Sequence, residues 1–167
     1  MSYIFAVVLG VLLLGADQFS KYFVATEFFE TEARPAIEGF FEWNYVKNRG
    51  AAWGMLDGHT WLLLAFTAVA MLVCIALLVK SGKNNKLLFW SVTLILSGGL
   101  GNMIDRIFRG YVVDFIHLQF IDFPVFNIAD CVIVIGAVLL MLNFLLDFKS
   151  SSKQKNEITL PEDVLDE

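Results

Sequence analysis

Residues 61–79, WLLLAFTAVAMLVCIALLV, form a run of nineteen residues without a charged side chain. A helix needs about 20 mainly apolar residues to cross the hydrocarbon core of a bilayer. This stretch therefore predicts a transmembrane helix, and it sets the solvent in which the rest of the chain must fold.

The composition of the whole chain agrees with a membrane protein. Apolar types make up 57% of the 167 residues and charged types 17%, and the mean hydropathy is +0.67. A soluble domain carries roughly 45–50% apolar and about 25% charged residues. The net charge of −5 equals the five acids of the last eleven residues, which contain no Lys or Arg. No basic stripe is present, so the sequence does not predict nucleic-acid binding.

Three further apolar segments accompany the first, and the predicted spans are residues 3–25, 60–79, 87–104 and 127–147. The first and last reach spanning length only if they include ionisable residues at one end. Asp17 and Lys21 enter the first span, and Asp130 enters the last. The first segment lacks a basic start and a small-residue cleavage site, so we expect it to remain as a helix and not to be removed as a signal peptide.

Basic residues predict the orientation of the four spans. Three lysines lie in the short connection between the second and third spans, and three more follow the fourth span. The positive-inside rule places both groups in the cytoplasm. Both termini are then cytoplasmic, and residues 26–59 and 105–126 form the outer face. The polar residues 150–167 are predicted to be a disordered cytoplasmic tail.

The outer segments are rich in aromatic residues. Residues 40–46, FFEWNYV, combine β-prone side chains with a preceding Gly39 and a following turn signal, so they predict a strand. Aromatic anchoring at the membrane interface is the alternative interpretation. A small folded cap over the bilayer and simple anchoring both stay open at this point.

Polar residues near the span ends are candidates for a functional site. Asp17 and Lys21 are four residues apart, so they share a helix face and can pair. A buried salt bridge that fixes the helix is favoured over direct catalysis, although Lys21 also has the length to reach a substrate carbonyl or a lipid headgroup.

Two glycine-rich stretches carry further polar residues. Residues 48–54, NRGAAWG, allow close approach of a ligand at Gly50, and Asn48 offers both a donor and an acceptor. From this stretch alone a plain turn is favoured. Residues 98–106, GGLGNMIDR, end the third span, where small residues let helices pack closely. Packing does not explain the cluster of Asn102, Asp105 and Arg106.

The strongest candidates for chemistry are Asp114 and Asp130. Each lies among apolar residues, in VVDFI (112–116) and FNIAD (126–130), and Asn127 precedes Asp130 by one helical turn. Two carboxylates close together in a medium of low dielectric share a proton, so one can act as base and the other as acid. A helix cap or a bridge to Arg would explain either aspartate alone. Two in this setting favour a catalytic dyad.

Other catalytic chemistries have little support. The two histidines, His59 and His117, lie in separate loops, and no H-E-x-x-H pattern is present. Cys74 and Cys131 each lie in an apolar run and are expected to pack as small hydrophobic residues. No metal site and no cofactor are predicted.

These motifs, in this order on four spans, resemble bacterial lipoprotein signal peptidase, also called signal peptidase II. The resemblance covers Asp17 to about Leu146 and rests on five stretches, DQFSK (17–21), NRGAAWG (48–54), GLGNMIDR (99–106), VDF (113–115) and FNIAD (126–130).

The resemblance implies a specific reaction. Such enzymes are metal-independent aspartyl endopeptidases of the bacterial cytoplasmic membrane, and they remove signal peptides from diacylglyceryl-modified prolipoproteins by cutting before the lipidated cysteine. By this similarity Asp114 and Asp130 are the catalytic pair. The residues implied to line or brace the site are Asp17, Lys21, Asn48, Gly50, Asn102, Arg106 and Asn127.

The resemblance also implies a fold and partners. The expected fold is an all-α membrane protein of four transmembrane helices, with a small extracytoplasmic β-cradle and a short outer helix. Its expected partners are lipid-modified prolipoproteins, membrane lipids and cyclic peptide inhibitors of the globomycin type. One chain supplies both aspartates, so a monomer is expected.

Two alternatives remain at the level of the sequence. A small transporter or channel would also place carboxylates in the membrane, but matching broken helices in two halves are not found. An intramembrane protease of the presenilin type also uses two aspartates. It carries Gly-x-Gly-Asp, whereas Asn102 follows Gly99-Leu100-Gly101 here.

Overall fold

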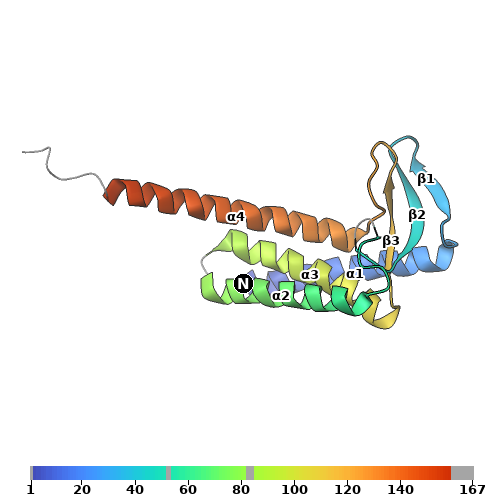
Figure 1. Ribbon diagram of the computed structural model, residues 1–167, viewed down its shortest axis with the longest axis horizontal. Coiled ribbons are helices and arrows are strands. Elements are labelled where there is room, and N and C mark those ends of the chain that lie inside the picture. The colour runs from blue at the N-terminus through green and yellow to red at the C-terminus, as the bar shows by residue number, and fades with distance from the viewer. Residues whose placement is uncertain (1, 52–53, 82–84, 159–167) are drawn as a thin grey trace, which may run out of the picture.

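In the computed structural model the backbone is described for residues 2–51, 54–81 and 85–158. The elements, in chain order, are α1 (Ser2–Glu27), β1 (Ala33–Ile37), β2 (Phe41–Asn48), α2 (Thr60–Ser81), α3 (Lys86–Phe108), β3 (Val112–Leu118) and α4 (Ile128–Ile158). The four helices run alongside one another, and the strands form a small sheet at one end of the bundle (Figure 1).

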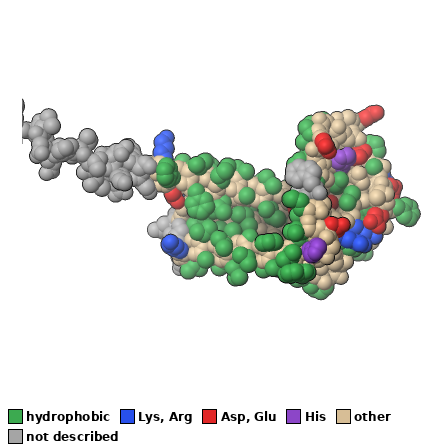
Figure 2. All heavy atoms as spheres, viewed as in Figure 1, with side chains coloured by type: hydrophobic (Ala, Val, Ile, Leu, Met, Phe, Trp, Pro, Cys, Tyr) green, Lys and Arg blue, Asp and Glu red, His purple; other side chains and the backbone are tan. Residues whose placement is uncertain are grey.

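All four helices are long and apolar enough to cross a membrane, over Ile4–Glu27, Thr60–Lys80, Lys86–Phe108 and Ile128–Lys149. Figure 2 shows hydrophobic side chains over the sides of the bundle, with charged side chains toward its two ends. This distribution fits a lipid environment around the helices and water at both ends. The four predicted spans are confirmed as helices of spanning length.

The helix ends differ from the predicted ends. α3 continues one turn past Ile104 to Phe108, because Asp105 and Arg106 find partners inside the protein. α4 begins at Ile128 and continues as helix to Ile158, although residues 150–158 were predicted to be disordered. Residues 159–167 of the predicted tail lie outside the described residues.

α3 is the central helix of the bundle. It contacts each of the other three helices, and 44% of its most apolar window is buried, against 17% or less for each of the others. Small residues allow this close packing. A Cβ at Gly98 would overlap Ala129 O of α4, and one at Gly101 would lie 2.5 Å from Asp17 Oδ2 of α1.

The sheet has three antiparallel strands in the order β1-β2-β3. The predicted strand at residues 40–46 is confirmed as β2, shifted to Phe41–Asn48, so Asn48 ends the strand and does not begin the turn. The edge strand β1 is exposed throughout and contains Pro35, whose missing N–H is tolerated at an edge. Outside the four long helices, Gly54 has 3₁₀ geometry, and residues 52–53 before it lie outside the described residues, so the short outer helix implied by the resemblance stays a prediction.

One apolar cluster fastens the sheet to the bundle. Val24 of α1, Tyr45 of β2, and Val113 and Phe115 of β3 are all buried together. Because side chains alternate between the two faces of a strand, Val113 and Phe115 share one face and Asp114 takes the other. The packing of β3 on α1 therefore sets the direction in which Asp114 points.

We predict that Gly101→Ala destabilises the protein by about 1–3 kcal/mol, because the added methyl group overpacks the contact with Asp17. The matched control is Gly15→Ala on α1, where a Cβ meets nothing within 4 Å. Thermal unfolding in detergent should show a lower midpoint for the first variant and no decrease for the second. Equal midpoints would contradict close packing at Gly101.

Candidate active site

The site is built around a buried lysine. Lys21 is 0% exposed, and its Nζ lies 2.9 Å from Asp17 Oδ2 and 3.2 Å from Asp105 Oδ2. It also donates a hydrogen bond of 2.9 Å to Asn102 Oδ1. A buried ammonium group is tolerated only when charges and hydrogen bonds compensate it. The predicted pair of Asp17 and Lys21 is therefore present, as one part of a larger network.

Asn102 and Asn127 connect this network to the two candidate catalytic aspartates. Asn102 Oδ1 accepts from Lys21 and, at 3.2 Å, from Asn127 Nδ2. With its oxygen occupied, the Asn102 amide turns its NH₂ toward Asp130 and donates to Oδ1 at 2.7 Å. Asn127 Nδ2 also donates to Asp114 Oδ1 at 2.6 Å. Asn127 is 0% exposed, so its buried side-chain amide links Asn102 to the Asp114 carboxyl group.

Asp130 lies in the first turn of α4 and takes part in its cap. Asn127 Oδ1 accepts from the Asp130 N–H at 3.0 Å, and Asp130 Oδ2 accepts from the Asn127 N–H at 3.1 Å. This reciprocal pair is a capping box, which satisfies amides that the helix start leaves free. Asp17 Oδ1 accepts from the Ala129 N–H at 2.9 Å and so satisfies a further free amide of the helix start. The start of α4 is therefore fixed from within and from α1.

Asp114 approaches from the sheet and is 2% exposed. Its Oδ2 accepts from Asn48 Nδ2 at 2.8 Å, across the β2–β3 pairing. Burial raises the pKa of Asp114 to about 7, and the charge of Asp130 contributes to the increase. The hydrogen bonds from Asn48 and Asn127 oppose it. Asp114 thus exchanges a proton near neutral pH, as a general acid or base requires.

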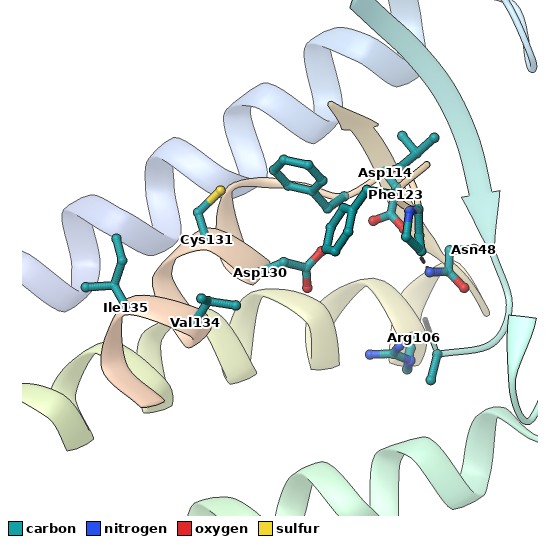
Figure 3. A pocket seen from close by; sticks show the side chains of 12 residues that line it. Asn48, Arg106, Asp114, Phe123, Asp130, Cys131, Val134 and Ile135 are labelled. Carbon is teal, nitrogen blue, oxygen red and sulfur yellow. Dashed lines mark hydrogen bonds between the residues drawn. The ribbon is translucent and has the colours of Figure 1, made fainter. Parts of the chain in front are cut away.

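Both aspartates line one cavity of about 580 Å³. Figure 3 shows Asp114 and Asp130 on its wall, with Asn48 and Arg106 toward one end and Val134 and Ile135 of α4 toward the other. One end of the cavity is therefore polar, and the other lies within the transmembrane part of α4. The remaining wall is the segment from Phe123 to Phe126.

The loop after β2 borders the polar end. Asn48 Oδ1 accepts from the Gly50 N–H at 2.9 Å, and Arg106 Nη2 donates to Gly50 O at 3.1 Å. A Cβ at Gly50 would lie 2.7 Å from Met55 O, so only glycine fits without displacement. Arg106 Nε is buried and has no hydrogen-bond partner among the described residues, which leaves a donor beside the cavity.

The structure brings all nine predicted site residues into one connected set of contacts. These residues are Asp17, Lys21, Asn48, Gly50, Asn102, Arg106, Asp114, Asn127 and Asp130. Their predicted roles in catalysis and binding stay predictions. Ala52 and Trp53 of the same loop lie outside the described residues.

The sequence prediction does not include Asp105 among the site residues. Asp105 is 0% exposed, pairs with Lys21 and accepts from the Val113 N–H at 3.2 Å. It therefore joins α1 to the strand that carries Asp114. Its position one helical turn after Asn102 was the only feature of the sequence that could have indicated a place in the site. The prediction also omits Cys131, which is half-buried and lines the cavity beside Asp130.

The fold and the site together define a four-helix membrane protein with a buried polar site at one end of the bundle. Residues 9–146 match the family model described as Signal peptidase (SPase) II. The chain therefore belongs to the signal peptidase II family, as the sequence motifs predict, and family membership makes it a peptidase.

Curated relatives agree over most of the chain. A protein of Enterococcus faecalis is 37% identical, over 89% of this chain and 92% of its own length. A protein of Caldanaerobacter subterraneus is 42% identical, over 86% of this chain and 97% of its own length. A Bacillus pumilus protein is 36% identical over 89% and 97%. All three are named Lipoprotein signal peptidase.

Two solved structures have the same fold, and each is described as a bacterial membrane enzyme. The first has a TM-score of 0.82 and 32% identity, over 87% of this chain and 90% of its own. The second has a TM-score of 0.77 and 32% identity, over 84% and 92%.

We predict that Lys21→Met lowers the free energy of unfolding by about 3–5 kcal/mol, because it leaves buried carboxylates without their cation. Lys47→Met is the matched control. Lys47 pairs with Glu30 at 2.7 Å, but the two side chains are 29% and 49% exposed, so its loss should cost about 0–1 kcal/mol. Chemical denaturation in detergent compares the two, and similar losses would contradict the central role of Lys21.

We predict a pH-dependent gain in stability for Asp114→Asn. The folded pKa of Asp114, about 7, lies above its ordinary value of 3.8. The native state then holds the proton more tightly than the unfolded state, so stability falls as pH rises from about 4 to about 7. The asparagine variant lacks this loss, which amounts to at most about 4 kcal/mol.

Thermal unfolding at pH 5 and pH 8 tests this prediction. The midpoint of Asp114→Asn minus that of the wild type should be larger at pH 8. A difference that does not change with pH would contradict a raised pKa at Asp114.

Proposed function

We propose that the protein is an aspartyl endopeptidase that removes signal peptides from diacylglyceryl-modified prolipoproteins, cutting before the lipidated cysteine. Membership of the signal peptidase II family and relatives named Lipoprotein signal peptidase support the substrate. One observation supports the chemistry above the others. Asp114 and Asp130 line one cavity, and the Asn127 side chain contacts both residues, donating to the Asp114 carboxyl group and accepting from the Asp130 N–H.

In the proposed reaction, the two carboxyl groups hold one proton and a water molecule between them. The ionised group removes a proton from water, and the resulting oxygen nucleophile attacks the scissile carbonyl carbon. The protonated group donates to the carbonyl oxygen, which gives a tetrahedral diol. Return of a proton to the amide nitrogen then breaks the C–N bond and releases an amine and a carboxylic acid.

The site residues that do not carry the proton have positioning roles in this proposal. Asn48 and Asn127 hold the Asp114 carboxyl group, and Asn102 holds that of Asp130. Arg106 lines the cavity, and its guanidinium group is suited to a carbonyl oxygen of the substrate. No step in this scheme requires a metal ion.

The cavity also suits a substrate held in the bilayer. Its wall continues along α4 through Val134 and Ile135, which are 60% and 54% exposed and face lipid in the proposed membrane setting. The signal peptide and the lipid of the substrate are proposed to enter from this side. A cyclic peptide of the globomycin type is expected to occupy the same cavity.

The proposed setting is the bacterial cytoplasmic membrane, with the site near its outer face and both termini in the cytoplasm. Lys80 and Lys86 lie at the end of the bundle away from the sheet, which supports this orientation. The sheet then forms the extracytoplasmic cradle. The protein is proposed to act as a monomer, since one chain supplies both aspartates.

We expect Asp114→Asn and Asp130→Asn each to abolish cleavage of a lipid-modified precursor, because each removes one member of the acid–base pair. Asp122→Asn is the matched control, since Asp122 is an exposed residue of the β3–α4 loop that does not line the cavity. The assay uses purified protein in detergent with a chelator present, and it reports the released signal peptide.

An unmodified precursor of the same sequence is assayed in parallel. The proposed function requires cleavage of the lipid-modified form only, insensitive to the chelator, and full accumulation of both asparagine variants in membranes. Activity of either variant on the lipid-modified precursor would overturn the dyad, and equal cleavage of both precursors would overturn the proposed substrate class.

A further inference from the structure

A second cavity of about 300 Å³ adjoins the first. Among the described residues, the two cavities have five lining residues in common, Asn48, Ala51, Asp114, Pro124 and Val125. Asp114 therefore lies on the boundary between them. A chain that extends from one cavity into the other passes the boundary residues, among them Asp114.

The two cavities differ in the residues beyond this boundary. The larger one continues along α4, past Cys131, Val134 and Ile135. The smaller one continues into the loop that follows β2, where Lys47, Arg49 and Asp57 add charged side chains. One side of Asp114 is thus apolar and lies in a spanning helix, and the other side is charged and lies outside the spans.

Beyond Asp114, two of the three charged residues among the described lining of the smaller cavity are available to a ligand. Lys47 is paired with Glu30 at 2.7 Å, and this contact raises the pKa of Lys47. Arg49 and Asp57 are exposed, and neither side chain makes a hydrogen bond or an ion pair within the described part of the chain. The cavity therefore presents one uncompensated cation and one uncompensated anion.

A lipid-modified precursor has the same polarity as this pair of cavities. Its signal peptide and lipid are apolar, and the chain after the lipidated cysteine is bound for water. If the bond to be cut lies at Asp114, the apolar part fits the larger cavity and the polar part fits the smaller one. The reversed direction would place the polar chain along Val134 and Ile135 inside the membrane, which is unfavourable.

We propose that the smaller cavity binds the residues that follow the lipidated cysteine in the mature chain, and that Arg49 and Asp57 discriminate among them by charge. This inference rests on the proposed function. Arg49 favours an acidic residue and disfavours a basic one, and Asp57 does the opposite. Because both groups are exposed, their effects are moderate and weaken with salt.

The test uses two synthetic lipid-modified peptides that differ only at the second residue after the cut, Asp in one and Lys in the other. The measured quantity is the ratio of kcat/KM for the Asp peptide to that for the Lys peptide. Arg49→Glu should shift this ratio toward the Lys peptide by about threefold to tenfold, and Asp57→Lys should shift it toward the Asp peptide by a similar factor. Both shifts should shrink in 1 M NaCl, where the Debye length falls to about 3 Å.

Matched controls carry the same charge changes on other exposed outer residues. Arg34→Glu on β1 and Asp122→Lys in the β3–α4 loop do not line either cavity, so they should leave the ratio within about twofold of the wild type. Arg49→Gln and Asp57→Asn should shift the ratio in the same directions as the charge reversals, by smaller factors. If a charge reversal prevents accumulation of the protein, the ratio of kcat/KM values is measured on these two variants instead.

The outcomes separate this inference from the proposed function. Cleavage of both peptides with ratios that none of the Arg49 and Asp57 variants changes would overturn the mature-chain subsite and leave the peptidase intact. Ratio changes of equal size in the controls would also overturn it, because they would indicate a general surface effect. Failure of the wild type to cleave either lipid-modified peptide would overturn the proposed function itself.

Discussion

The ammonium group of Lys21 has no contact with solvent, and the rest of the site depends on how that charge is compensated. Its partners Asp17, Asp105 and Asn102 bring α1 and α3 together. Asp17 then binds the start of α4, and Asp105 binds the backbone of β3. The two elements that carry Asp130 and Asp114 are therefore both fixed to the partners of one buried cation, because leaving it unpaired would cost several kcal/mol.

Asp130 combines two roles that the sequence presents as alternatives. A single aspartate at a helix start is explained well enough as a cap, and Asp130 does take part in a capping box with Asn127. The same residue lines the cavity that Asp114 lines. Capping holds the carboxyl group at a fixed place at the positive end of the helix dipole. The structural role thus supplies the rigidity that the proposed chemistry needs.

Hydropathy was sufficient to predict the four spans, and β-prone residues between turn signals were sufficient for β2. Asn102 and Arg106 are four residues apart, which puts them on one side of α3 but gives no partners for them. The contact between Lys21 and Asn102 joins residues 81 positions apart, and local patterns carry no information at that separation. β1 escaped prediction because it is five residues long, contains Pro35 and buries none of its side chains, so it shows no alternation. Asp105 was visible as a polar neighbour, but only the folded bundle shows that it pairs with Lys21.

The change of solvent along the cavities explains why so polar a site can exist at the edge of a membrane protein. Buried amides and carboxyl groups satisfy one another in the layer formed by Asn102, Asn127 and the two aspartates. This layer has little contact with its surroundings. Lys21 is fully buried, and Asp114, on the strand face opposite Phe115, is almost fully buried. The larger cavity continues onto the apolar surface of α4, and the smaller one continues to the exposed charges of Arg49 and Asp57. In the proposed function, a bond placed at Asp114 lies where the substrate passes from lipid to water, so the polarity of the two cavities and the two carboxyl groups together support the proposed position of the cut.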